Sequence, residues 1–223
     1  MKSYDKTLIQ SVIDKYRLSE IQSESEIRSK FIVGLSEALG YPSQLRGEEF
    51  PVYGYAGGEP LKAKNADFIF FTESSFGRYR GNTQNSKTWV EEHSLLIIEA
   101  KKPGKMPEDL GQVKFYTTWT SAVAYIETDG EDFIGYFVNP ISADQKVIEA
   151  KVDELPDKPE IWMFCYENVL SVKQKGYSAK IFPLSMRLWK IRLVRLLQRI
   201  LNLCSQKRPF PTSGTVWEKM QKD

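Results

Sequence analysis

Residues 94–101 read Ser-Leu-Leu-Ile-Ile-Glu-Ala-Lys: four consecutive apolar residues that lead into an acid, an alanine and a base. A short apolar run of this kind is typical of a buried β-strand. Side chains two residues apart in a strand point to the same face, so Glu99 and Lys101 would emerge together while Ala100 faces away. Lys102-Pro103-Gly104 then ends the strand. The sequence therefore predicts a carboxylate and an ammonium group side by side at an accessible strand end.

Before this strand, the hydrophobic pattern changes from helical to extended. Apolar residues at helical spacing predict a short helix from Leu8 to Tyr16. A second helix is indicated by a capping box at Ser23 and Glu26 and ends at Gly40. Its apolar stripe consists of Ile27, Phe31, Leu35 and Leu39. Runs rich in β-formers predict consecutive strands at 49–53, 66–71 and 94–101.

The remaining segments complete the expected order of elements. The polar stretch 72–88 lacks apolar periodicity, and we expect an exposed loop there. Pro107 is expected to open a helix that continues to about Trp119. Further strands are predicted at 123–127 and 133–138, around an Asp129-Gly130 turn, and residues 159–173 look helical. This α-β-β-β-α-β-β order predicts an α/β (α+β) fold with a mixed central sheet flanked by helices.

Charge is unevenly distributed between two predicted parts of the chain. Residues 1–183 carry 22 Lys and Arg against 27 Asp and Glu, whereas residues 184–223 carry 9 against 2. The first part is expected to be the folded domain. The second is expected to be a basic amphipathic C-terminal helix and tail packed on it, with an apolar stripe from Leu184 to Leu201. A basic helix of this kind most often presents a solvated cationic face. Binding to a phosphate backbone and binding to a membrane surface are the alternatives.

Composition excludes several classes of protein. Of the 223 residues, two are cysteines, without C-x-x-C spacing, and one is a histidine, His93, so zinc ribbons, disulfide scaffolds and multi-histidine metal sites are excluded. The sequence has no apolar run long enough for a membrane span, no signal peptide and no Walker A loop for ATP. We therefore expect a cytoplasmic protein that neither enters a membrane nor uses ATP, and a stand-alone chain rather than a fragment.

A third candidate for the site is Asp67, the only charged residue in the strand at 66–71. If this strand is a neighbour of the strand at 94–101, Asp67 and Glu99 could share a divalent cation. Carboxylate oxygens suit Mg²⁺ or Mn²⁺, which can polarise a phosphoryl oxygen and activate a bound water. Lys101 would then position the attacking water and stabilise the charge that develops on phosphorus.

At these residues the sequence resembles the PD-(D/E)XK nuclease superfamily. Asn65-Ala66-Asp67 stands for the PD element and Glu99-Ala100-Lys101 for (D/E)XK. Gln112 and Tyr116 resemble the Q-x-x-x-Y motif that follows the catalytic lysine in part of that group, and they lie at i and i+4 on one helix face. Within the superfamily, roughly residues 20–140 look like the N-terminal nuclease domain of type I restriction enzyme R subunits, without the helicase motor that follows it there.

The resemblance implies a restriction-endonuclease-like fold and a Mg²⁺- or Mn²⁺-dependent DNA endonuclease of restriction or defence type. Asp67 and Glu99 would hold the metal, and Asp67, Glu99, Lys101 and Glu26 would form the catalytic set. It also implies that Gln112, Tyr116 and Lys102 contact DNA. Restriction-system specificity or modification subunits are possible partners, and a homodimer would supply two active sites for double-strand cleavage.

Each assignment has a plainer alternative. Glu99 and Lys101 could be a surface ion pair, and the capping box explains Glu26 without catalysis. Tyr116 could pack against the sheet with its hydroxyl satisfied nearby. An exposed edge charge is the expected role of Glu49. The whole chain could also be a catalytically inactive module that binds nucleic acid or a restriction-system partner, whereas a small-molecule phosphodiesterase is disfavoured because no glycine-rich nucleotide cradle is present.

Overall fold

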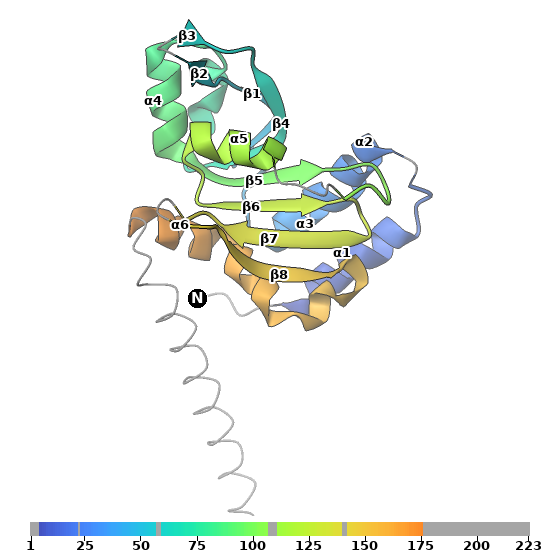
Figure 1. The fold of residues 1–223 in the computed structure, drawn as a ribbon. Helices are drawn as coiled ribbons and strands as arrows, with labels where there is room; N and C mark the ends of the chain where they lie inside the picture. The colour runs from blue at the N-terminus through green and yellow to red at the C-terminus, as the bar shows by residue number, and fades with distance from the viewer. Residues whose placement is uncertain (1–4, 22, 57–58, 107–110, 140–141, 176–223) are drawn as a thin grey trace, which may run out of the picture. The chain divides into compact units, whose positions relative to one another are not determined.

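The computed structural model describes residues 5–21, 23–56, 59–106, 111–139 and 142–175, and a six-stranded sheet runs through them (Figure 1). Its strand order is β1-β4-β5-β6-β7-β8. Neighbouring strands are antiparallel except β5 and β6, which are parallel. The strands are β1 (Arg46–Val52), β4 (Lys64–Phe71), β5 (Ser94–Ala100), β6 (Ala124–Thr128), β7 (Asp132–Phe137) and β8 (Gln145–Lys151).

Strand β5 lies inside the sheet, between β4 and β6. All seven of its residues are buried, as expected for an apolar run with helices on both faces. The parallel connection from β5 to β6 passes through helix α5 (Gly111–Thr120), because a parallel pair cannot be joined by a tight turn. The protein is therefore a mixed α/β fold with a mostly antiparallel central sheet flanked by helices.

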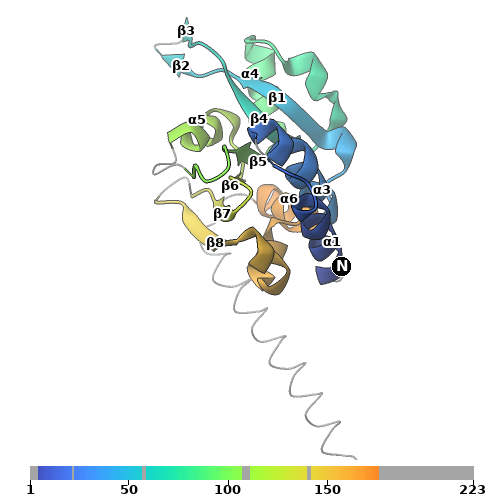
Figure 2. The ribbon, with the colours of Figure 1, turned by 90° about the vertical axis from the view of Figure 1, so that its right-hand side faces the viewer.

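Helices cover the two faces of the sheet, as the edge-on view in Figure 2 shows. Helix α5 lies on one face. On the other face lie α1 (Lys6–Arg17), α3 (Val33–Ala38) and α6 (Tyr166–Gln174). Helix α3 continues from α2 (Glu24–Glu26) through a π-helical stretch. In this segment all four residues of the predicted apolar stripe are buried: Ile27, Phe31, Leu35 and Leu39.

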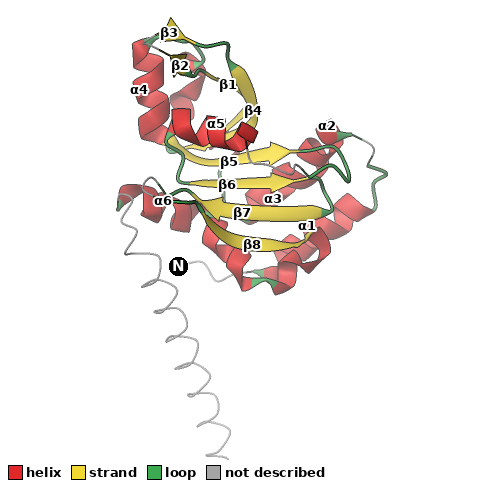
Figure 3. Ribbon diagram, viewed as in Figure 1, coloured by secondary structure: helices red, strands yellow, loops and turns green. Residues whose placement is uncertain are grey.

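Smaller elements connect the main ones (Figure 3). A two-stranded hairpin is formed by β2 (Tyr55–Ala56) and β3 (Glu59–Pro60). The described residues also contain α4 (Gln84–His93) and four 3₁₀ segments. These 3₁₀ segments are η2 (Ser43–Leu45), η3 (Ser74–Tyr79), η4 (Val152–Asp157) and η5 (Pro159–Phe164). None of the described helices is long and apolar enough to cross a membrane.

The prediction of an exposed loop at 72–88 is confirmed for exposure, since most of these residues are exposed, but it is wrong for the backbone, which is largely helical. This stretch contains η3 and the first turn of α4, which Thr83 caps by accepting the backbone N–H of Ser86. Its order comes from aromatic packing rather than from a periodic apolar pattern. The rings of Tyr79 and Trp89 stack with centroids 4.5 Å apart, and Phe76 stacks on Phe71 at 5.2 Å. Such contacts between separate segments leave no periodic signal in the sequence.

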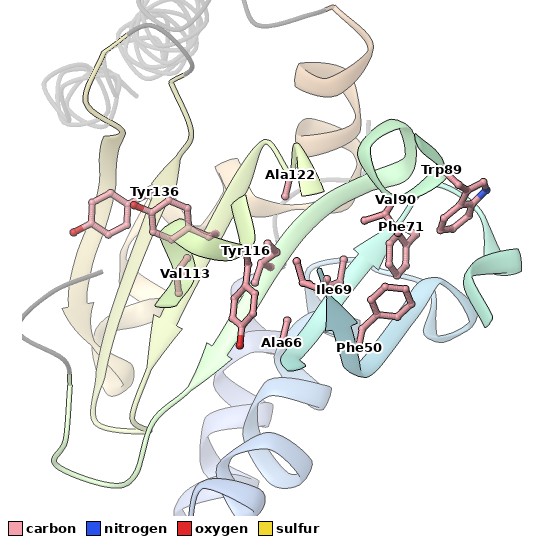
Figure 4. Close-up of a cluster of buried hydrophobic side chains, with 13 residues drawn as sticks. Phe50, Ala66, Ile69, Phe71, Trp89, Val90, Val113, Tyr116, Ala122 and Tyr136 are labelled. Atoms are coloured by element: carbon pink, nitrogen blue, oxygen red, sulfur yellow. The ribbon is translucent and has the colours of Figure 1, made fainter. Parts of the chain in front are cut away.

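A buried cluster joins β1, β4 and β5 to α4 and α5 (Figure 4). Phe50 and Phe71 meet edge to face in this cluster, with Trp89 beside them. Tyr116 crosses from α5 toward the sheet and is fully buried. The cluster therefore fixes α5 against the strands that carry Asp67 and Glu99.

Other expected elements are found with small shifts in their bounds. The helix at 8–16 corresponds to α1, and the strands at 123–127 and 133–138 correspond to β6 and β7. Strand β8 was not predicted. The expected start of a helix at Pro107 and the C-terminal helix and tail at 184–223 lie outside the described residues, which belong to one unit of the chain, Met1–Tyr177.

Two glycines in turns test how much local backbone geometry contributes to stability. Gly130 (φ 84°) and Gly104 (φ 67°) both adopt left-handed backbone conformations that other residues rarely take. A Cβ atom at residue 130 would overlap the Tyr16 hydroxyl, whereas one at residue 104 would meet nothing within 4 Å. We expect Gly104→Ala to lower the free energy of unfolding by about 1–2 kcal/mol. Gly130→Ala should lower it clearly further, as measured by urea denaturation, and equal losses in the two variants would contradict the packing around Tyr16.

Candidate functional site

Asp67 on β4 and Glu99 on β5 lie where the backbone pairing of these two strands stops. The last paired position is Phe68 with Ile98, so Asp67 and Glu99 are next to each other in the register. Beyond this position, backbone N–H groups of the two strands donate to the carboxylates of these acids instead of to backbone carbonyls. The Asp67 Oδ2 atom accepts the backbone N–H of Ala100 at 2.8 Å, and Glu99 Oε2 accepts the backbone N–H of Asp67 at 3.4 Å. The structure thus brings the two predicted acids together, both of them buried.

Lys101 and Gln112 complete a network around Glu99. The Lys101 ammonium lies 3.3 Å from Glu99 Oε1 and donates to the Gln112 side-chain oxygen at 2.9 Å. The Gln112 amide nitrogen donates to the same Glu99 oxygen at 2.5 Å. Gln112 therefore accepts from the cation with its oxygen and donates to the acid with its nitrogen. Because Gln112 is exposed at the start of α5, it is also accessible to a ligand.

Tyr116 fixes the position of the Gln112 side chain. Its hydroxyl accepts the Gln112 amide at 2.9 Å and donates to the Asn65 carbonyl at 2.6 Å, and its side chain is fully buried. Burial, together with the negative charge of Glu99, raises the pKa of Tyr116 well above its usual range. Tyr116 thus has the packing described by the plainer alternative: its side chain, without exposed surface, packs against the sheet and its hydroxyl positions Gln112.

Arg28 is a site residue that the sequence reading did not select. Its Nη1 atom lies 3.0 Å from Asp67 Oδ1 and 3.0 Å from Glu49 Oε1. Arg28 belongs to the π-helical stretch, and such wide turns often occur at functional sites. Glu49 is an exposed charge on the edge strand β1, as predicted; it has a left-handed backbone (φ 45°) and pairs with Arg28. No local motif marks this pairing, because the three residues come from separate elements.

Glu26 interacts within its own helix. Its backbone N–H donates to the Ser23 hydroxyl, and its carboxylate accepts from that hydroxyl at 3.0 Å and from Lys30 at 3.0 Å. The capping alternative describes these contacts without a catalytic role. The negative charge of Glu24, in the same helical segment, contributes to raising the pKa of Asp67. Glu127 on β6, paired in register with Glu99, is a further buried acid that the sequence reading passed over.

Both central acids have raised pKa values. Burial, followed by the negative charge of Asp67, raises the pKa of Glu99 to about 8, while Lys101 opposes this shift. Burial also raises the pKa of Asp67, against the opposing effects of the Ala100 N–H and Arg28. Two neighbouring buried carboxylates disfavour each other's ionised form. Raised pKa values of this kind are common where a protein binds a cation or moves a proton.

A cleft opens beside Asp67. It has a volume of about 420 Å³, and its lining includes Arg28, Glu49, Asp67 and Arg80. The predicted DNA contact Lys102 lies elsewhere, exposed in the turn after β5, where its carbonyl accepts the backbone N–H of Lys105 at 2.9 Å. Access from solvent is therefore available both at the cleft and at the end of β5.

The donor set of the site fits a cation that keeps most of its water. The described residues contain no group of three or more Asp, Glu, His or Cys side chains arranged to hold a metal ion. Asp67 and Glu99 offer two carboxylates, and Mg²⁺ is commonly bound by one or two carboxylates together with water and phosphate oxygens. These two acids disfavour each other's ionised form, and a bound divalent cation would relieve that repulsion.

Comparison of the chain with protein-family models, with curated proteins and with solved structures finds no match.

The raised pKa of Glu99 predicts how stability depends on pH in metal-free buffer. A glutamate in an unfolded chain has a pKa of about 4.3, whereas the pKa of Glu99 in the folded protein is about 8. Because the folded pKa is the higher one, the stability that protonated Glu99 contributes is complete below the unfolded pKa and is lost as pH rises to about 8. Glu99→Gln keeps the shape without a titrating proton, so it should flatten this decline and be the more stable protein at pH 8, by about 1–3 kcal/mol.

The control for this measurement is Glu149→Gln, which changes an exposed acid on β8. Its stability should follow the wild-type pH profile when unfolding is monitored by circular dichroism at pH 5, 6, 7 and 8. A Glu99→Gln profile that also coincides with wild type would show that Glu99 is ionised throughout this range.

Proposed function

We propose that this protein is a Mg²⁺- or Mn²⁺-dependent DNA endonuclease of restriction or defence type. The observation that carries the proposal is the meeting of Asp67, Glu99 and Lys101 where the pairing of two adjacent strands stops, with Gln112 hydrogen-bonded to the last two. An acid pair beside a fixed lysine suits phosphodiester hydrolysis, in which negative charge develops on the phosphate oxygens.

The order of elements supports a PD-(D/E)XK type of fold. An N-terminal helical segment is followed by the antiparallel strands β1, β4 and β5, then by α5, and then by β6 parallel to β5. This is the order in which the resemblance to the type I restriction R-subunit nuclease domain places its motifs. On this proposal the protein acts in the cytoplasm, and restriction-system subunits or a second copy of the chain are its candidate partners.

Each residue has a defined part in the proposed reaction. Asp67 and Glu99 would hold the cation, which would supply Lewis-acid activation of water and charge neutralisation at phosphate. Lys101 would direct its ammonium toward the attacked phosphate, since Glu99 and Gln112 fix its position. Gln112 orients Lys101 and is itself oriented by Tyr116. Tyr116 is thus a positioning residue, whereas Lys101 acts on the substrate.

The alternative is a catalytically inactive module that binds nucleic acid or a restriction-system partner. One observation favours it: the Arg28 guanidinium already neutralises Asp67 at 3.0 Å. Cleavage of supercoiled plasmid with Mg²⁺ or Mn²⁺ separates the two functions, because only the nuclease converts the plasmid to nicked or linear forms.

The two acids should be required for both cleavage and metal binding. We expect Asp67→Asn and Glu99→Gln each to reduce plasmid cleavage by at least about 100-fold, since an amide is a weak ligand for Mg²⁺. The rise in melting temperature on adding Mn²⁺ should disappear in the same variants, because that rise reflects binding to the folded state. Glu149→Gln is the matched control and should retain both properties. Undiminished nicking by both site variants would remove the nuclease assignment from these residues.

Lys101 should separate catalysis from binding. Lys101→Ala is expected to cut plasmid at least about 100-fold more slowly. Its affinity for Mn²⁺ should stay at the wild-type level or rise, because a competing cation has been removed from Glu99. Lys105→Ala, an exposed change in the adjoining turn, is the control. Cleavage by Lys101→Ala at the wild-type rate would refute the role of this lysine.

A further inference from the structure

The cleft beside Asp67 is lined by residue types that commonly bind phosphate. Two arginines line it, Arg28 from the π-helical stretch and Arg80 from the end of η3. Ser25 and Ser29 add hydroxyl groups on the helical side. Two guanidinium groups facing one polar cleft of about 420 Å³ are a common means of binding phosphate, since the planar guanidinium can donate two parallel hydrogen bonds to it.

Arg80 is held in place by contacts that leave its charge unneutralised. Its Nη2 atom donates to the backbone carbonyl of Glu48 at 2.5 Å, and its guanidinium lies over the Phe50 ring at 5.3 Å. The Glu48 carboxylate is bound by Arg46 Nε at 2.9 Å. A carbonyl and an aromatic ring orient a guanidinium but do not cancel its charge, so Arg80 remains a fixed cation at the cleft.

Arg28, in contrast, still has donors to offer. A single nitrogen, Nη1, makes both of its ion pairs, to Glu49 and to Asp67. Within the described part of the chain, its Nε and Nη2 atoms have no hydrogen-bond partner. The Arg28 side chain is 23% exposed and lines the cleft. A guanidinium carries five N–H donors, so Arg28 can bind an anion in the cleft.

The charge of the cleft depends on whether a cation is bound at Asp67. Glu48 is paired with Arg46, which leaves Arg28 and Arg80 balanced against Glu49 and Asp67. A divalent cation on Asp67 would give this group a net charge of about +2 and attract a polyanion. The same cation would repel the Arg28 guanidinium, which occupies one of the Asp67 oxygens.

We propose that the cleft binds a backbone phosphate of the DNA beside the cleavage site, and that Arg28 moves from Asp67 to this phosphate when the divalent cation binds. Arg80 binds the same stretch of backbone without leaving its place. This inference rests on the proposed function and adds a substrate-binding residue to it. It makes Arg28 a competitor of the cation in the free protein and a partner of the substrate in the loaded one.

The test uses three charge-removing variants of the full chain. Mg²⁺ affinity is measured without DNA by isothermal titration at pH 8.5, where protons compete less for the two acids. Affinity for a 20-bp duplex is measured by fluorescence anisotropy with Ca²⁺ over a series of salt concentrations. Arg28→Gln removes the shuttling residue, and Arg80→Gln removes the fixed one. Lys30→Gln is the control: it lies on the same helical segment and pairs with Glu26.

The three variants should differ in a specific way. Arg28→Gln should bind Mg²⁺ about tenfold more tightly and lower the salt slope of DNA binding by about one, because one phosphate contact is lost. Arg80→Gln should lower the salt slope equally at unchanged Mg²⁺ affinity. Lys30→Gln should change neither quantity.

Two results would overturn the inference: Arg28→Gln with wild-type or weaker Mg²⁺ affinity, or Arg80→Gln with the wild-type salt slope. The second can be read even if Arg28→Gln does not fold. Failure of the proposed function is distinguishable from both, because it appears in the wild-type protein, which then leaves supercoiled plasmid uncut with Mg²⁺ or Mn²⁺.

Discussion

The candidate site depends on one local event, the exchange of hydrogen bonds between two acids and two backbone amides where β4 and β5 stop pairing. Asp67 accepts from Ala100, and Glu99 accepts from Asp67. A buried carboxylate without such donors loses several kcal/mol of hydration, on the order of what a whole domain has to spare. Here each acid takes up an amide that the interrupted ladder would otherwise leave unsatisfied. The interrupted pairing and the two acids therefore stabilise each other. The same arrangement places the two acids, which carry like charges when ionised, next to each other.

Two cationic side chains, one for each acid, balance these negative charges. Arg28 reaches Asp67 from the helix on one face of the sheet, and Lys101 reaches Glu99 from the end of β5 itself. The two pairs are built differently. Lys101 is fixed by Gln112, which Tyr116 fixes in turn from within the buried cluster. Among the residues that the structure describes, the Arg28 guanidinium is held only by the two acids that it neutralises, through one nitrogen. The site thus has a rigid side and an exchangeable side.

How far the sequence predicts this arrangement depends on the range of the interactions. Short runs of apolar residues and β-formers located β4 and β5, and the i, i+4 spacing correctly placed Gln112 and Tyr116 on one helix face. The same spacing could not tell which of the two is buried, since that depends on the depth of α5 over the sheet. Arg28 was missed because its partners are 21 and 39 residues away and belong to strands. The order of residues 72–88 was missed because it depends on ring stacking between segments.

The pairing of β4 with its other neighbour, β1, explains how the charged residue Asp67 can lie inside the sheet. Strand β1 pairs with β4 at Glu48 with Phe68 and at Phe50 with Ala66, and between these positions Glu49 faces Asp67 without forming a pair. Glu49 has left-handed backbone geometry there, which costs about 1–2 kcal/mol for a residue with a side chain. Its ion pair with Arg28 offsets part of this cost. Asp67 therefore lies between two interrupted ladders, with β1 distorted on one side and the exchanged hydrogen bonds of β5 on the other. Restoring regular pairing on either side would bring backbone hydrogen bonds back and take away the space in which this acid is reached by Arg28 and by the cleft.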